Sequence, residues 1–206
     1  MRSPPPQLAP ERLADVLAEG WGLRAVSLQY VPEGGGSHHW TLTDSAGQRY
    51  FVTVDDLDNK DWIGGSRDAV FDGLRCALST AAALRYDAGL RFVMAPIAAC
   101  DGLPLRWVDG PYTASVFQFL TGRSHPFGPY TDARLRNQVL DMIAVLHQAG
   151  GARRRAPSCP PVRRPGRSGR VSSQPGSALG QRACRRSSTR FATALRRGSR
   201  ADRHDV

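Results

Sequence analysis

Residues 30–44, YVPEGGGSHHWTLTD, contain the most informative pattern for the fold of this chain. A glycine-rich turn, GGGS at residues 34–37, separates two segments that are rich in β-branched and aromatic side chains. Such segments predict strands, here residues 25–31 and 38–43, with the turn between them. A third strand is predicted at residues 49–54, RYFVTV, after a turn of composition Asp-Ser-Ala-Gly. The three strands are expected to form an antiparallel meander.

Helical spacing of apolar residues predicts helices on both sides of this meander. Pro10 suits a first helical turn, and apolar residues follow at helical spacing until Gly20, which is expected to close the helix. Beyond the meander, Ser66 is a candidate N-cap for an amphipathic helix that runs to about residue 88. A further helix is expected from Thr131, as its N-cap, to Gly150.

Short strands are expected between the second and third helices. Residues 92–97, 103–108 and 113–119 are apolar-leaning segments separated by Asp-Gly turns. Strands in meanders with one packed helix are typical of the α+β class and not of a parallel doubly wound sheet. The predicted fold class is therefore α+β.

Charge divides the chain into two unlike parts. The 206 residues carry a formal net charge of +10. Residues 1–151 hold 13 basic and 16 acidic side chains, whereas residues 152–206 hold 15 arginines and two aspartates. Residues 152–206 also contain only six Leu, Ile, Val or Phe residues, too few to offset the entropy lost on folding. We therefore expect a slightly acidic folded body followed by a disordered, arginine-rich tail.

Several classes of protein are excluded by pattern. No run of 18 apolar residues is present, which argues against a transmembrane helix. The first residues lack the apolar segment of a secretory signal, so a cytoplasmic location is expected. The four cysteines form no Cys-x-x-Cys pair and the histidines lack partners at metal-ligand spacing. No metal site is predicted, and His38 and His39 are interpreted as surface residues of the second strand.

The order of these elements resembles the N-terminal lobe of the kinase-like fold, and more narrowly the aminoglycoside phosphotransferase family in its spectinomycin phosphotransferase-like branch. The segments that carry the resemblance span about residues 25–150; they are YVPEGGGSHHWTLTD, RYFVTVDDLD, RFVMAPI, ASVFQFLTG and RNQVLDMIAVLHQAG. The resemblance implies an N-lobe at residues 1–121, then a linker and the first helix of an incomplete C-lobe at residues 122–151. The tail is residues 152–206.

The resemblance implies ATP and Mg²⁺ as cofactors and assigns a nucleotide site. Gly34, Gly35, Gly36 and Ser37 would cover the phosphates, because glycine lets the backbone approach them and donate its N–H groups. A flexible hairpin loop is the alternative interpretation of this turn.

Other positions of the site match the family only in part. Gln118, Phe119 and Leu120 fall where a kinase-like hinge contacts adenine through its backbone, or simply end a core strand. The lysine that holds the phosphates in such folds is replaced by Thr53. Lys60 could reach back towards the site, but a solvated surface lysine is the favoured interpretation. The second helix contains no glutamate to pair with such a lysine.

The catalytic part of the family's pattern is missing from the sequence. No His-Gly-Asp loop, following Asn or later metal-binding Asp is found after residue 150, so no catalytic residue is assigned. The resemblance thus implies a truncated kinase that is inactive as written, its acceptor site mostly missing. Residues 152–206 are interpreted either as a frameshift product, because GC-rich DNA read out of frame encodes Arg, Pro, Gly and Ala, or as a genuine basic arm.

Two other functions are compatible with the sequence. The arginines of the tail would bind nucleic acid or another polyanion weakly, without sequence preference and with steep salt dependence. Alternatively, the lobe is a pseudokinase-like interaction module whose exposed apolar face, including part of residues 131–150, contacts a partner.

Overall fold

A computed structural model of the chain describes residues 1–122 and 128–149. Its centre is a six-stranded antiparallel sheet in the order β1-β2-β3-β6-β4, with β5 also paired to β6. The strands are β1 Ala25–Val31, β2 His38–Asp44, β3 Arg49–Asp56, β4 Pro96–Ile97, β5 Arg106–Asp109 and β6 Tyr112–Gln118. The α+β class is confirmed.

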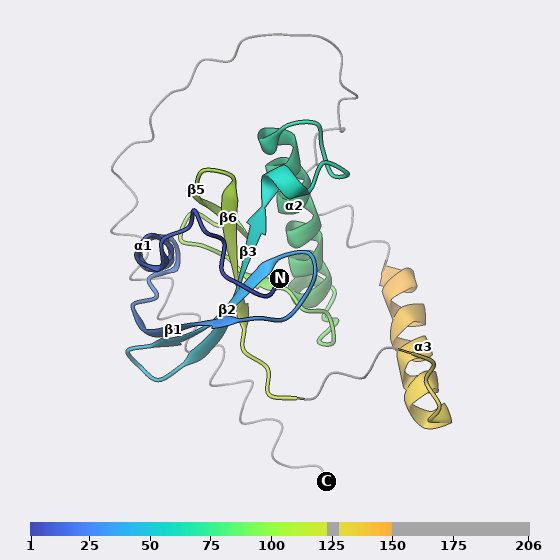
Figure 1. Cartoon of the computed structure of the whole chain (residues 1–206). Coiled ribbons are helices and arrows are strands. Elements are labelled where there is room, and N and C mark those ends of the chain that lie inside the picture. The colour runs from blue at the N-terminus through green and yellow to red at the C-terminus, as the bar shows by residue number, and fades with distance from the viewer. Residues whose placement is uncertain (123–127, 150–206) are drawn as a thin grey trace.

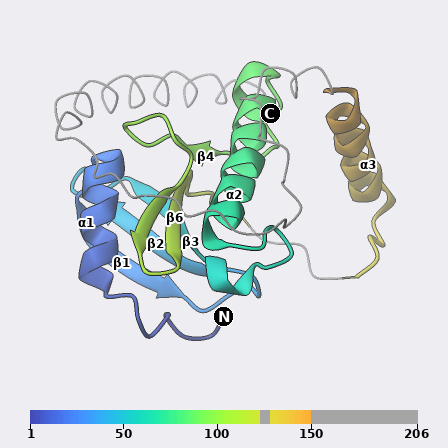
Figure 2. The same cartoon turned by 90° about the horizontal axis from the view of Figure 1, so that it is seen from above.

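Two helices cover the sheet from opposite sides (Figures 1 and 2). Helix α1, Pro10–Trp21, lies against one face, and α2, Arg67–Ala82, lies on the other. A short 3-10 turn, Leu57–Asn59, follows β3, and a π-helical turn, Ala83–Asp87, extends α2. The remaining described helix is α3, Ala133–Gln148.

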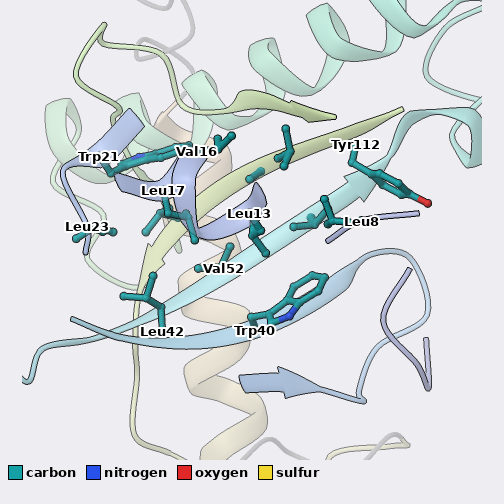
Figure 3. Close-up of a cluster of buried hydrophobic side chains, with 14 of the residues drawn as sticks. Leu8, Leu13, Val16, Leu17, Trp21, Leu23, Trp40, Leu42, Val52 and Tyr112 are labelled. Atoms are coloured by element: carbon teal, nitrogen blue, oxygen red, sulfur yellow. The ribbon is translucent and has the colours of Figure 1, made fainter. Parts of the chain in front are cut away.

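The main hydrophobic core lies between α1 and the sheet (Figure 3). Leu13 and Leu17 of α1 and Leu42, Val52 and Val116 of three neighbouring strands are fully buried. Burial of one such side chain stabilises the fold by about 1.5–3 kcal/mol. This face of the sheet is therefore the one that holds the lobe together.

The predicted meander and the start of the second helix are confirmed. Strands β1, β2 and β3 lie where the sequence places them, each within two residues of the predicted end. Ser66 is the N-cap of α2, and its hydroxyl accepts a hydrogen bond from the Ala69 backbone N–H at 3.2 Å. The strand predicted at residues 113–119 is β6, shifted by one residue.

Two helix boundaries differ from the prediction. Gly20 lies inside α1 and is buried; the left-handed residue that ends the helix is Gly22, with φ of 71°. The N-cap of α3 is Asp132 rather than Thr131, because the Asp132 carboxylate accepts hydrogen bonds from the backbone N–H groups of the first helical turn. A carboxylate at this position also interacts favourably with the helix dipole.

Two predicted strands are shorter than expected. Residues 92–97 form only the two-residue strand β4, while the Phe92 and Met94 side chains are exposed. Residues 103–108 form a strand only from Arg106 onwards. Pro96 and Pro104 both lack the backbone N–H that ladder pairing uses, which limits the two strands.

Helix α3 differs from the other helices in its packing. None of its residues is buried within the described parts of the chain. Its predicted apolar face, which includes Leu135, Val139 and Leu146, is half-buried, and Leu140 and Ile143 are exposed. The arginine-rich tail at residues 152–206 lies outside the described residues, as does the predicted helix end at residue 150.

Candidate functional site

The face of the sheet opposite α1 is polar near the glycine-rich turn. Strand register pairs Thr53 with both His39 and Ser115, and it pairs Asp55 with Thr113. Directly paired residues present their side chains on the same face. These five side chains therefore form one polar face on β2, β3 and β6.

The glycine-rich turn joins β1 to β2 at the edge of this face. Gly34 has φ of +88°, and a Cβ built on it would lie 2.9 Å from Nε2 of His39. Gly34 is thus required by the backbone and by the close approach of the histidine ring. Gly35 and Gly36 are exposed and lack a positive φ, and a Cβ on either would meet nothing within 4 Å. The fold itself therefore gives no reason for glycine at these two positions.

Lys60 reaches back to this turn, and its interpretation as a solvated surface lysine is wrong. The side chain is buried, with a relative exposure of 6% for the residue. Its ammonium Nζ lies 2.7 Å from the Gly36 carbonyl oxygen and 3.0 Å from Oδ1 of Asp55. The 3-10 turn after β3 brings Lys60 to this place, so its sequence distance from the strand does not keep it away from the site.

Ser37 and Asp55 complete the contacts around the ammonium. The Ser37 hydroxyl donates a 2.5 Å hydrogen bond to Oδ1 of Asp55, the same oxygen that faces Lys60. Lys60 Nζ lies 3.5 Å from this hydroxyl, at the outer limit of a hydrogen bond. We call Gly36, Ser37, Asp55 and Lys60 the turn cluster; it ties the glycine-rich turn to the end of β3.

Thr53, at the position of the expected strand lysine, contributes no charge to the site. Its hydroxyl lies 3.3 Å from Nδ1 of His39, whose ring stacks on Phe51 with centroids 5.0 Å apart. Burial lowers the pKa of His39, and the nearby carboxylate of Asp55 opposes that shift more weakly. The neutral imidazole is therefore favoured beneath the turn.

His38 lies on the opposite, apolar face, and its interpretation as a surface residue is wrong. It is buried, with a relative exposure of 8%, and its Nδ1 lies 3.2 Å from the Tyr30 hydroxyl. Burial lowers the pKa of His38 as well. Two adjacent histidines of one strand thus serve different faces of the sheet.

The predicted hinge residues lie at the end of β6 and directly after it. Gln118 ends β6 opposite Tyr50, and Leu120 is exposed. The guanidinium of Arg49 lies 3.7 Å from the centroid of the Phe119 ring, a cation–π contact. Tyr50, which pairs with Gln118, is four residues from Val54, which pairs with His38 beside the turn. At about 3.3 Å per residue, the hinge and the turn are therefore about 13 Å apart along β3.

The structure therefore places the predicted residues at two ends of one sheet, and it adds residues that the sequence did not indicate. No periodicity or motif in the sequence indicates that Asp55 and Arg49 lie at the site, or that Lys60 folds back to it. Within residues 1–122 and 128–149, no group of three or more His, Cys, Asp or Glu side chains is placed to hold a metal ion. No helix of those same residues has the length and hydropathy needed to cross a membrane.

Comparisons with known proteins identify the fold. Neither a family model nor a curated protein matches the sequence. A solved structure of spectinomycin phosphotransferase, in complex with ADP and spectinomycin, matches 69% of this chain and 38% of its own length, with a TM-score of 0.50 and 12% identity. A structure of amicoumacin kinase, in complex with AMP-PNP and Ca²⁺, matches 58% of this chain and 34% of its own, with a TM-score of 0.42 and 13% identity.

The first of these likenesses shows the architecture of the described body. The sheet with its packed helix is a kinase-like N-terminal lobe, as the sequence predicted. Within that class, the structure resembles that of an antibiotic phosphotransferase. The chain spans well under half the length of the solved structures that it matches.

Proposed function

We propose that this chain is the nucleotide-binding lobe of a small-molecule phosphotransferase of the aminoglycoside phosphotransferase type. In this proposal, Gly34, Gly35, Gly36 and Ser37 cover the phosphates of ATP, and Thr53 lies on the sheet face below them. Gln118, Phe119 and Leu120 provide the hinge for the adenine ring. The acceptor is a hydroxyl of an antibiotic or a similar small molecule.

The observation that carries this proposal is the pair of glycines at the exposed tip of the turn. The backbone at Gly35 and Gly36 is not left-handed, and space above both Cα atoms is open to at least 4 Å. Glycine lowers the stability of a turn through its conformational freedom, so it needs another reason to be there. Close approach of a phosphate to backbone N–H groups supplies such a reason.

The dimensions of the sheet face support the same proposal. The turn begins next to Val54 of β3 and the predicted hinge begins next to Tyr50, four residues earlier on the same strand. An extended nucleotide has its base at one end and its phosphates at the other, so it can contact the hinge with the base and the turn with the phosphates. The spectinomycin phosphotransferase structure of similar fold contains ADP.

We further propose that this 206-residue chain binds nucleotide without transferring a phosphoryl group. Phosphoryl transfer depends on metal ions and on a carboxylate that orients the acceptor hydroxyl. The His-Gly-Asp pattern that would supply this carboxylate is not found in the sequence. Residues 1–121 would then form the binding lobe, residues 122–151 the linker and first C-lobe helix, and residues 152–206 a separate basic segment.

The binding test uses the full chain and one added charge. ATP binding is measured by calorimetry for the wild type, for Gly35→Asp, and for Ser45→Asp as a matched control in the turn between β2 and β3. Gly35→Asp should weaken ATP binding at least tenfold, because the open space accepts the side chain while its charge repels phosphate. Ser45→Asp should leave the affinity within twofold. Equal affinity of the wild type and Gly35→Asp would contradict the proposal.

A second candidate function rests on the charge of residues 152–206. Fifteen arginines against two aspartates would bind nucleic acid through its phosphates and release counterions. The dissociation constant for a single-stranded oligonucleotide should then rise steeply with salt, and replacement of Arg153, Arg154 and Arg155 by glutamine should flatten that dependence. An affinity that does not change with salt would exclude this function.

A further inference from the structure

The turn cluster presents a charge arrangement that the fold alone does not explain. Lys60 and Asp55 are both buried, with residue exposures of 6% and 7%. Removal of two charges from water costs several kcal/mol per ion before their attraction is counted. A surface position for the lysine would avoid this cost, yet the only lysine of the chain is held under the glycine-rich turn.

The same cluster lies where two expected charges are absent. Thr53 takes the position of the strand lysine, and α2, Arg67–Ala82, contains no glutamate. Lys60 and Asp55 bring an ammonium and a carboxylate to 3.0 Å from one another, on the same side of the sheet as Thr53. Both come from β3 and the turn that follows it, and neither comes from the helix.

We propose that Lys60 is the phosphate-binding cation of the nucleotide site and that Asp55 is its positioning residue. The inference deepens the proposed function and rests on it. A lysine in the turn after β3 would then bind phosphate in place of a lysine within β3. Its carboxylate partner would come from the strand and not from α2.

The donors of the ammonium support this role. An ammonium group has three N–H donors. Two are engaged at short distance, by the Gly36 carbonyl at 2.7 Å and by Asp55 at 3.0 Å. Among the described residues, the third faces the Ser37 hydroxyl at 3.5 Å, which already donates its own proton to Asp55. One donor of Lys60 is therefore weakly engaged and can turn to an anion.

The position of the ammonium relative to the turn supports the role further. Nζ contacts the carbonyl of Gly36, so an anion on the backbone N–H groups of this turn would lie within about one peptide unit of the positive charge. Trp62 flanks the ammonium with its ring centroid 5.5 Å away and is itself 71% exposed. The cation thus lies between the buried carboxylate and the open edge of the turn.

The acidic residues near the turn make a cation at this place important for binding of a polyanion. Residues 55–61 contain four aspartates, and the turn itself is preceded by Glu33. Arg67 is engaged by Asp58 in a two-pronged ion pair, with 2.6 Å and 2.5 Å contacts. Within the part of the chain that the structure describes, the other cation at this turn is the Met1 ammonium, on the Gly34 carbonyl oxygen. Loss of the charge of Lys60 would therefore remove one of the two positive charges beside these carboxylates and weaken the attraction of a nucleotide.

The test replaces the buried ion pair by a neutral pair of similar shape. Removal of Lys60 alone would leave a buried, unpaired carboxylate and endanger folding. The variant Lys60→Gln with Asp55→Asn keeps hydrogen-bonding groups at both positions and removes both charges. A third substitution, Thr53→Lys, adds a lysine on β3 to this variant. Binding of ATP and of adenosine to each full-length chain is measured by ligand-observed NMR at matched salt.

The neutral pair should weaken ATP binding at least tenfold and leave adenosine binding within twofold, because adenosine has no phosphate. Addition of Thr53→Lys should recover most of the loss for ATP. A purely structural role for the pair would weaken both ligands together, and a lysine on β3 would not restore ATP binding.

The outcomes separate this inference from the proposed function. If the wild type and the neutral pair bind ATP equally well, Lys60 is not the phosphate-binding cation, while the lobe remains a nucleotide-binding lobe. If ATP and adenosine are weakened alike, the inference is also overturned. If the wild type binds no ATP saturably, the proposed function fails and this inference fails with it.

Discussion

The two faces of the sheet are built from alternate residues of the same strands, yet they differ in composition and in the interactions that order them. The face under α1 is apolar and closed, with Leu42, Val52 and Val116 fully buried. The face on the side of α2 presents His39, Thr53 and other polar groups beneath the glycine-rich turn. The first face is stabilised by burial of apolar area, and the part of the other face beneath the glycine-rich turn is ordered by specific hydrogen bonds and one ion pair.

The contrast assigns stability to the apolar face of the sheet and ligand binding to the polar face. The stability that comes from apolar burial on the α1 face does not depend on which polar side chains the other face carries. The α1 face can therefore stabilise the fold while the other face keeps charged and polar side chains in place. The fixed alternation of strand residues keeps the two roles apart, because a shift of one residue would exchange them.

The largest expected effect is a difference in stability between substitutions at two adjacent residues of β2 whose side chains lie on opposite faces of the sheet. Leu42→Ala should lower the free energy of unfolding by about 2–5 kcal/mol, because it opens a cavity at a fully buried site. Thr41→Ala, one residue earlier and half-buried on the polar face, should cost less than about 1 kcal/mol. Denaturant unfolding measures both. Similar losses for the two variants would contradict the division of roles between the faces.

The next effect contrasts glycines within the turn. Gly34→Ala should lower stability by about 1–2 kcal/mol, because its φ of +88° is unfavourable for alanine and its Cβ would press on His39. Gly35→Ala should be neutral or slightly stabilising, because its Cβ points into open space. Thermal unfolding of both variants checks this expectation. A loss at Gly35 as large as at Gly34 would show that the fold constrains the tip of the turn.

A third prediction concerns pH and the two histidines on opposite faces. Burial holds the pKa of His38 and His39 below the ordinary value of 6.5, so the unfolded chain binds more protons in acid than the folded chain does. Stability is therefore fully present above pH 6.5 and should fall as the pH decreases below it. His38→Gln and His39→Gln should each reduce this slope in unfolding experiments at pH 7.5 and 5.5. Unchanged slopes in both variants would contradict the assignment.

The smallest effect concerns Thr113, on the polar face opposite Asp55. Its buried hydroxyl oxygen has no hydrogen-bond partner among the described residues. Thr113→Val removes this group at nearly constant shape, so stability should stay the same or rise by about 1 kcal/mol. Chemical denaturation of this variant gives the value. A clear loss of stability would show that the hydroxyl has a partner in solution.

The strands β1, β2, β3 and β6 and the N-cap at Ser66 could be predicted because local composition and alternation determine them. The face to which each histidine belongs could not, because His38 and His39 are equal in sequence and only the register with β3 distinguishes them. Thr131 and Asp132 are both good N-caps, and the backbone of the first turn selects Asp132. Pro96 shortened β4 because it lacks the N–H that a ladder needs.

The sequence shows the glycine-rich turn of the candidate site but does not show the buried ion pair beside it. A glycine-rich turn between strands is a local pattern, so residues 34–37 were visible in the sequence. The Lys60–Asp55 pair depends on a 3-10 turn that folds the lysine back over the end of β3. Such a reversal has no periodicity, and a lysine in an acidic loop resembles any solvated lysine.

The most direct test of the account is residue-resolved NMR of the full chain during a titration with ATP. We expect saturable shifts of the backbone amides of residues 34–37, with smaller shifts at Phe119 and Leu120, and little change on the α1 face. Shifts confined to the arginine-rich residues 152–206, or shifts that spread evenly over the body without saturation, would contradict a nucleotide site on the polar face of the sheet.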